Sequence, residues 1–544
     1  MKINKKIKVA TILAACATIL AACGNNNSSS DSKKDEASFG LNTEVASMDT
    51  LKAQDSNSFD VQAAVFSGLY RLNSNDKVVP DIASGNPKLS NGNKTYTINL
   101  RHNAKWSNGT PVTAADFEYA WKRGANPKTK SNYGYILQTF LKNGQAIANG
   151  KISPDKLGVK AIGKYKLQVN LEAPTPYFKS LLTFNPYFPQ NKKFVEKQGA
   201  KYATSPSTMI YNGPFKVSSY NQGASNISLT RNKDYVGPVK AHLQKINFNI
   251  IKNDTTGLNE YQAKKLDTTF ISTSLVKSSK NMSGFKTVPN SMVTFLRFNQ
   301  KNNSSTPFHN KALRTAIYNS LNTKQLADKV LQDGSSSLTG FIPPKFVTNP
   351  ATGNDFRAEG GDLYKNNADT AKKAWATAKK QLRKDKINVQ LLIDDEDWQK
   401  TTAEYIQSQL QKQLTGLTVS IRSIPQQQEL ANVAASKYQM VLGQWGPDYQ
   451  DPNTYLATYI SGNASGYNNK QFDKYIANAN SKDVNDPAKR FEDFHQAEKL
   501  LVQDDNAIVP LNQQVYSILQ RPNLKGITHH MVGAPFTYAT AYWK

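Results

Sequence analysis

The side chains that could carry out covalent or metal chemistry form no catalytic pattern in this sequence. The chain has 544 residues, with only two cysteines and six histidines. It contains no His-Glu-x-x-His zinc motif, no Gly-x-Ser-x-Gly nucleophile turn, no phosphate-binding loop and no dinucleotide fingerprint. The adjacent pair His529-His530 would project in different directions from any regular element, so we interpret it as surface rather than as a metal site. We therefore expect a binding protein that is not an enzyme and needs no cofactor or metal.

The first 23 residues divide into the zones of an export signal. Four lysines, at positions 2, 5, 6 and 8, precede an uncharged and mostly apolar run over residues 9–22. This run is shorter than the roughly 20 apolar residues that cross a bilayer. It ends in Leu20-Ala21-Ala22-Cys23, which resembles the lipobox of bacterial lipoproteins, where the cysteine thiol receives a diacylglyceryl group before cleavage. We expect residues 1–22 to be a lipoprotein signal peptide and Cys23 to be the lipidation site.

The same four residue types also end at Cys16. Acylation there would leave a shorter apolar zone and an apolar segment after the cut, whereas Cys23 is followed by polar residues. Residues 23–36 have the composition of a lipidated flexible tether. Because Cys16 would leave with the signal peptide, the mature chain could form no internal disulfide. Its stability would then depend on a large hydrophobic core.

The charge balance is strongly basic. Loss of the four leader lysines, with no acidic residue lost, lowers the net charge from +27 to about +23. The remaining lysines are spread from Lys33 to Lys544 without a run longer than two, and no nucleic-acid-binding motif is present. We predict a solvated basic surface suited to an anionic cell envelope, and no nucleic-acid partner.

Residue periodicity predicts strands that alternate with helices. Residues 95–100 and 166–171 alternate as half-buried strands do, and residues 389–393 form a compact apolar strand. Thr113, with Asp116 three residues later, predicts a helix start. A later helix should end near Gly416, and another should start with Asp486 as cap and Pro487 in its first turn. Their predicted inward-facing residues are Ala403, Ile406, Leu410, Leu414, Phe491, Phe494, Leu500 and Leu501. The fold class is therefore mixed α/β.

Two segments resemble a known family. Residues 94–101 (KTYTINLR) and 105–117 (KWSNGTPVTAADF) resemble the signature of family-5 extracellular solute-binding proteins, the oligopeptide-binding proteins of ABC transporters. Residues 444–452 (QWGPDYQDP) resemble the ligand-site strand and turn of the peptide-binding members. Shorter similar stretches extend the resemblance from about Glu44 to at least Pro510.

The resemblance implies a two-lobed clamp like that of periplasmic binding proteins, with an additional inserted domain and lobes that are discontinuous in sequence. By analogy, the first lobe comprises residues 37–65, 184–300 and 506–544, the additional domain residues 66–183, and the second lobe residues 301–505. The implied protein is a monomeric receptor, lipid-anchored on the extracellular face of the cell membrane of a Gram-positive bacterium. It captures oligopeptides and delivers them to the permease and ATPase subunits of an ABC importer.

The chemistry of a peptide agrees with the site that the resemblance implies. A receptor can pair with a peptide backbone as an added strand without reading its side chains. The apolar strand from Met440 ends in Gly-Pro and an acid, so the Asp448 carboxylate could face the free amine. Core packing of Trp445 and turn capping by Asp448 are the alternatives, and Trp106 and Asp116 of the signature are interpreted as structural. The expected ligand contacts are Asp448, Trp445, Gln444, Gly446, Tyr449 and, by spacing from the signature, Tyr133.

Three positions depart from the family pattern. By local counting, Leu331, Val433 and Leu442 stand where the enteric oligopeptide receptor has basic residues that hold the carboxylate of short peptides. None of the three can bind a carboxylate, so longer peptides, or a terminus held by other lysines, are open alternatives. Two other functions also stay open: a receptor of the same fold for a nickel complex, haem or oligosaccharide, and a basic wall-associated adhesion protein.

Overall fold

The computed structural model describes residues 35–221, 223–303 and 305–544. The chain divides into two units, Met1–Lys34 and Asp35–Lys544. The predicted signal peptide, Cys23 and nearly all of the predicted tether lie outside the described residues. All that follows concerns the second unit.

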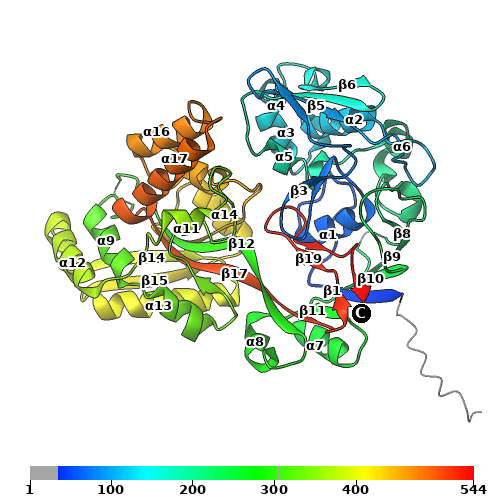
Figure 1. The fold of residues 1–544 in the computed structure, drawn as a ribbon. Helices are drawn as coiled ribbons and strands as arrows, with labels where there is room; N and C mark the ends of the chain where they lie inside the picture. Colours follow the sequence, from blue (N-terminus) through cyan, green and yellow to red (C-terminus); the bar gives the residue numbers. More distant parts are fainter. Residues whose placement is uncertain (1–34, 222, 304) are drawn as a thin grey trace, which may run out of the picture. The chain divides into compact units, whose positions relative to one another are not determined.

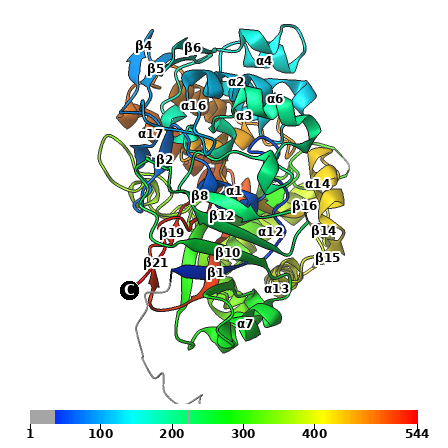
Figure 2. The ribbon, with the colours of Figure 1, turned by 90° about the vertical axis from the view of Figure 1, so that its right-hand side faces the viewer.

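An eleven-stranded mixed sheet is the largest element of the described chain (Figures 1 and 2). Its order is β15-β14-β16-β12-β17-β11-β1-β10-β9-β8, and β13 pairs with β17 beside this path. The strands are β1 (Glu36–Leu41), β8 (Phe215–Ser219), β9 (Asn226–Arg231), β10 (Lys245–Ile250), β11 (Thr268–Phe270), β12 (Phe285–Phe298), β13 (Ser336–Ser337), β14 (Ile387–Ile393), β15 (Leu417–Ser423), β16 (Met440–Trp445) and β17 (Ile508–Gln520). The long strands β12 and β17 pair antiparallel and join the two halves of the sheet.

A separate four-stranded antiparallel sheet carries the family signature. Its order is β4 (Lys88–Ser90), β5 (Thr95–Asn99), β7 (Lys166–Asn170) and β6 (Val159–Gly163), and α2 (Ala114–Ala125) contacts β6 and β7. The predicted strands at residues 95–100 and 166–171 are confirmed. The helix start is also confirmed, because the Thr113 amide and hydroxyl both donate to the Asp116 carboxylate, at 2.7 and 3.0 Å. Trp106 is 2% exposed, in keeping with a structural role.

Helices flank both sheets. In Figure 1, α12 and α13 lie beside β14 and β15. The first eight helices are α1 (Ser56–Val65), α2, α3 (Gly134–Phe140), α4 (Gly144–Ala148), α5 (Phe178–Leu181), α6 (Lys192–Gln198), α7 (Asp254–Gln262) and α8 (Thr273–Ser279). The others are α9 (Lys311–Ser320), α10 (Thr323–Gln325), α11 (Phe356–Gly360), α12 (Ala368–Leu382), α13 (Asp397–Gln413), α14 (Gln426–Ala434), α15 (Asn453–Leu456), α16 (Lys470–Asn480) and α17 (Pro487–Lys499).

Short strand pairs are β2 (Tyr70–Leu72) with β3 (Val78–Pro80), β18 (Leu524–Lys525) with β21 (Tyr542–Trp543), and β19 (Thr528–His529) with β20 (Phe536–Thr537).

The elements predicted after residue 380 are also confirmed. The strand predicted at residues 389–393 is part of β14, and the helix before Gly416 is α13. Asp486 caps α17 by accepting a hydrogen bond from the Lys489 amide at 3.2 Å. Of the residues predicted to face inward, all are buried except Leu500, which is partly buried. The mixed α/β class is therefore confirmed.

Most of the core lies in two large hydrophobic clusters, and two small clusters lie beside them. The first takes residues from 37 to 250 and from 518 to 541, and the second takes residues from 293 to 511 together with Met531 and Val532. The first cluster includes residues of both the predicted first lobe and the predicted additional domain, so burial alone does not separate these two. The lobe and domain boundaries stay predictions.

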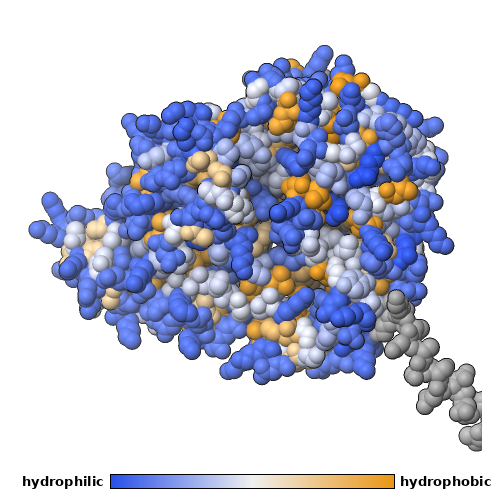
Figure 3. Space-filling view, in the orientation of Figure 1, coloured by the Kyte–Doolittle hydropathy of each residue, from blue (hydrophilic) through white to orange (hydrophobic). Residues whose placement is uncertain are grey.

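The face in Figure 3 is mostly hydrophilic, and its hydrophobic residues form small separate groups. This distribution agrees with the predicted solvated surface. Across the described part of the second unit, no helix is both long enough and apolar enough to cross a membrane.

Candidate ligand-binding cleft

A cavity of about 260 Å³ brings together residues from distant parts of the chain. Gly446, Pro447 and Asp448, which follow β16, form part of its wall, and Tyr133 forms another part. Three of the six predicted ligand residues, Tyr133, Gly446 and Asp448, therefore line one cavity, which is called the cleft below. Its remaining lining residues are Gln54, Ser56, Phe59, Phe184, Asn290, Ser291, Met292, Tyr516, His530, Met531, Val532, Gly533 and Pro535.

Asp448 is a half-buried acid without a cationic partner. None of the ion pairs formed among the described residues involves it. Burial raises the pKa of Asp448 above the ordinary value of 3.8, although a hydrogen bond with Tyr135 opposes this shift. A carboxylate that has lost water without gaining a positive charge is costly. A ligand amine would supply the missing charge.

Tyr133 forms an aromatic wall of the cleft. Its ring meets Phe184 and Phe59 edge to face, with ring centroids 4.9 and 5.6 Å away. Burial is the main cause that raises the pKa of Tyr133 to about 12, and the negative charge of Asp448 adds to it. Tyr133 and Asp448 therefore lie close enough to interact, as the predicted site requires.

Gln444 and Trp445 are at the end of β16, next to the cleft rather than in its wall. They pair with Thr294 and Val293 of β12. The Gln444 side-chain oxygen accepts a hydrogen bond from Gln514 at 3.1 Å. Trp445 packs partly against the second hydrophobic cluster, and its buried indole N–H has no hydrogen-bond partner among the described residues. Core packing, the alternative role predicted for Trp445, therefore accounts for part of the burial of its side chain.

Tyr449 belongs to an aromatic stack rather than to the cleft wall. Its ring stacks on Tyr177 and meets Phe140 edge to face, with a centroid distance of 5.8 Å in the second contact. Behind the stack, Arg490 binds both carboxylate oxygens of the buried Asp451, at 2.7 and 2.8 Å. The segment that carries Asp448 is therefore fixed by contacts with residues far away in sequence.

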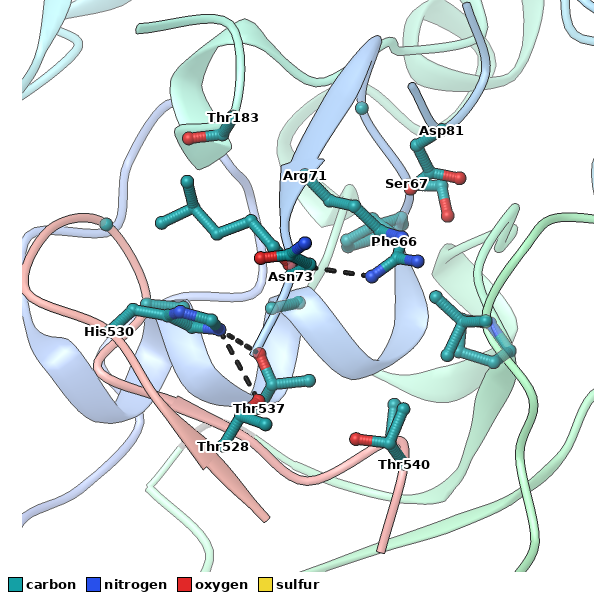
Figure 4. A pocket seen from close by; sticks show the side chains of 18 of the residues that line it. Phe66, Ser67, Arg71, Asn73, Asp81, Thr183, Thr528, His530, Thr537 and Thr540 are labelled. Atoms are coloured by element: carbon teal, nitrogen blue, oxygen red, sulfur yellow. Dashed lines mark hydrogen bonds between the residues drawn. The ribbon is translucent and has the colours of Figure 1, made fainter. Parts of the chain in front are cut away.

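The interpretation of His529-His530 as a surface pair is wrong. His530 is only 6% exposed, and its ring contacts the carboxylate of Asp76 at 2.7 Å. It also contacts the hydroxyl of Thr537 at 3.2 Å (Figure 4). Burial, with the charge of His530 as a smaller cause, lowers the pKa of His529 to about 4. The physical reason is tertiary contact: β19 pairs with β20 and brings Phe536 against the His529 ring, with centroids 5.4 Å apart, while Asp76 contacts His530 from a distant part of the chain.

Sequence reasoning missed several cleft residues, among them Gln54, Ser56, Asn290 and Tyr516. No local pattern marks them. Ser56 starts α1, Asn290 is inside β12 and Tyr516 is inside β17, and only the tertiary fold brings them together.

None of the three residues that depart from the family pattern lines the cleft. Leu331 and Leu442 are buried in the second hydrophobic cluster, and Val433 packs against a small cluster around Leu392. In the described chain, no lysine or arginine lines the cleft. A ligand carboxylate would therefore find no lysine or arginine side chain in this wall, and the one histidine there, His530, contacts Asp76.

A second and larger cavity, of about 430 Å³, is shown in Figure 4. Its walls carry Arg71, Asp81 and Thr183, and it shares His530, Val532 and Gly533 with the cleft. It contains none of the predicted ligand residues. We therefore take the smaller cavity beside Asp448 as the candidate site.

Comparisons with known proteins identify the family. Residues 77–467 match the sequence profile of the bacterial extracellular solute-binding proteins of family 5. A dipeptide-binding protein of Lactococcus lactis subsp. cremoris (strain MG1363) is 34% identical over 561 residues, which cover 100% of both chains.

Solved structures agree with this match. Listeria monocytogenes OppA bound to peptide is 35% identical, with a TM-score of 0.75 over 94% of this chain and 99% of that one. The substrate-binding domain of an oligopeptide ABC transporter from Bacillus anthracis (strain Ames) has the same TM-score at 34% identity, with coverages of 94% and 99%. The fold predicted from the sequence is therefore confirmed, and the chain belongs to the family-5 bacterial extracellular solute-binding proteins.

Proposed function

We propose that this protein is a receptor that captures oligopeptides in the cleft beside Asp448 and delivers them to a membrane ABC importer. The observation that carries the proposal is the half-buried Asp448 carboxylate, which faces the cleft without a cationic partner. A relative named as a dipeptide-binding protein and a similar structure with bound peptide support this ligand class. The protein captures its ligand without altering it.

The ligand's free amine binds Asp448, because a charge-assisted hydrogen bond there would offset the cost of the buried carboxylate. The peptide backbone lies between the Gly446-Pro447 turn and the polar side chains of Gln54 and Ser56 on the other wall. Since backbone groups are the same in every peptide, this arrangement accepts many sequences. Among the described residues, no lysine or arginine in the wall neutralises a nearby carboxyl terminus, which favours longer peptides over dipeptides.

Outside the cleft, the proposal includes a lipid anchor at Cys23 on the extracellular face of the membrane of a Gram-positive bacterium. The receptor acts as a monomer with the permease and ATPase subunits of its importer. The two lobes and the additional domain have the boundaries given above. The sequence motif around Cys23 and the Gram-positive relatives support this part.

Native mass spectrometry of the protein purified under mild conditions tests the ligand class. We expect a set of masses that correspond to peptides and that disappear after partial unfolding and refolding. Calorimetry of the refolded protein with a pentapeptide should then show saturable binding. Retained haem, a metal complex or an oligosaccharide, with no response to any peptide, would show that the proposed ligand class is wrong.

A further inference from the structure

A third cavity, of about 370 Å³, adjoins the cleft. The two share Gln54, Ser56, Tyr516 and Pro535 in their walls. A peptide in the cleft can therefore extend a side chain into this neighbouring space. The space is called the side pocket below.

Its charged lining consists of two acids. Asp55 and Asp60 line the side pocket, and no lysine, arginine or histidine of the described chain does so. This is unusual for a protein with a net charge of +27. Neither acid forms an ion pair with any described residue.

The buried Asp60 carboxylate has one oxygen that no hydrogen bond within the described chain occupies. The residue is 1% exposed, and its Oδ1 accepts a hydrogen bond from the Phe536 amide at 2.8 Å. Its Oδ2 accepts no hydrogen bond from any described residue. Burial raises the pKa of Asp60, the Phe536 hydrogen bond opposes this, and the charge of Asp55 adds to the rise. A cation in the side pocket would relieve this cost.

Three aromatic rings complete the lining. Phe270, Tyr516 and Phe536 meet one another edge to face, with centroid distances of 5.9, 5.7 and 5.2 Å. Aromatic faces attract cations and also pack against the alkyl part of a long side chain. Carboxylates and aromatic rings around one space are the combination that recognises an ammonium or guanidinium group.

We propose that the side pocket is a subsite for a lysine or arginine side chain of the bound peptide, with Asp60 and Asp55 facing its charge and the three rings around its stem. The inference rests on the proposed peptide-binding function and narrows its substrate class to peptides with a basic residue at one fixed position. A metal ion is a poorer occupant, because no group of three metal-binding side chains occurs in the described chain.

Calorimetry with the mature protein tests the subsite. The ligands are alanine-based pentapeptides with a free amine, in which one lysine is moved through the five positions. Each has a partner with Nε-acetyl-lysine, which keeps the length and removes the charge. At one position, lysine should bind about tenfold or more tightly than acetyl-lysine. At the other positions the two should bind within about twofold of each other, a difference of roughly 0.4 kcal/mol.

The variant Asp60→Asn keeps an oxygen that can accept from the Phe536 amide, so the fold should be preserved. It should remove the lysine preference and leave the affinity for acetyl-lysine peptide unchanged. Asp81→Asn is the matched control, since Asp81 is a 4% exposed aspartate that lines the other cavity (Figure 4). This control should keep the preference.

The inference is overturned if lysine and acetyl-lysine bind alike at every position, or if Asp60→Asn keeps the preference. It is also overturned if Asp81→Asn loses the preference equally. Cadaverine serves as a free cation: binding of cadaverine that needs Asp60, without any lysine preference among peptides, would indicate a small-cation site instead. If acetyl-lysine peptides bind, the proposed function stands whatever the lysine result. If no peptide binds, the proposed function fails and the subsite fails with it.

Discussion

The rings of Tyr177 and Tyr449 stack face to face, with centroids 4.4 Å apart and only 3° between their planes. Tyr177 precedes α5, whereas Tyr449 directly follows the candidate amine anchor Asp448. The stack therefore fixes the position of the cleft wall through a residue that does not line the cleft.

Removal of either ring should weaken peptide binding. An aromatic pair contributes about 0.5–1.5 kcal/mol beyond its buried area, so Tyr177→Ala should lower peptide affinity by about two- to tenfold. Tyr449→Ala should have a similar effect. The double variant should bind the peptide no more weakly than the single variant with the lower affinity, because both changes remove the same contact. Calorimetry with one pentapeptide measures all three. Tyr177→Phe keeps the ring and is the control, and an unchanged affinity in Tyr177→Ala would contradict this role of the stack.

The burial of His529 should make the protein less stable in mild acid. Its pKa is about 4 in the folded protein and 6.5 in its ordinary state, so the unfolded chain binds the extra proton between these values. The contribution to stability is complete above pH 6.5 and is lost as the pH falls toward 4. By pH 5 the loss should be about 2 kcal/mol.

Urea unfolding at pH 7 and pH 5 measures this loss. The variant His529→Gln should lose less stability than wild type between the two pH values. The exposed His309, changed to glutamine, is the control and should leave the pH dependence as in wild type. Equal losses in wild type and His529→Gln would show that His529 is not the responsible group.

Lipidation at Cys23 should anchor the protein. Cys23→Ala should either release the protein into the medium or leave an unprocessed form that retains its signal peptide, since no thiol remains to be acylated. Fractionation of cells and the mass of the mature amino terminus measure both outcomes. Cys16→Ala is the control and should stay anchored. A mature Cys23→Ala protein without lipid that remained firmly bound to membranes would contradict the assignment.

Local sequence signals predicted the elements that depend on neighbouring residues. The capping pair Thr113 and Asp116, the alternation in β5 and β7, and the cap at Asp486 are set within a few positions, and each element forms as expected. The order of the large sheet could not be predicted in this way. The parallel pairing of β1 with β10 and the long pairing of β12 with β17 join residues that are far apart in sequence.

The site residues also divide into those that a sequence motif marks and those that only the tertiary fold brings together. The family resemblance selected six ligand residues, and three of them, Tyr133, Gly446 and Asp448, line the cleft. It could not select Gln54 or Tyr516, because no motif includes them. The surface interpretation of His529 and His530 was wrong because tertiary contacts with Phe536 and Asp76, and not the local pattern, determine their burial.

We propose that Asp448 binds the free amine of a peptide. A calorimetric cycle tests it most directly, with wild type and Asp448→Asn each titrated with a pentapeptide and with its N-acetylated form. Loss of one member of a buried, hydrogen-bonded charge pair costs about 2–5 kcal/mol, or roughly thirtyfold to several thousandfold in affinity. Acetylation should weaken binding to wild type by this factor and have little further effect on Asp448→Asn, because both changes remove the same interaction. Equal binding of the free and acetylated peptides by wild type would contradict the account.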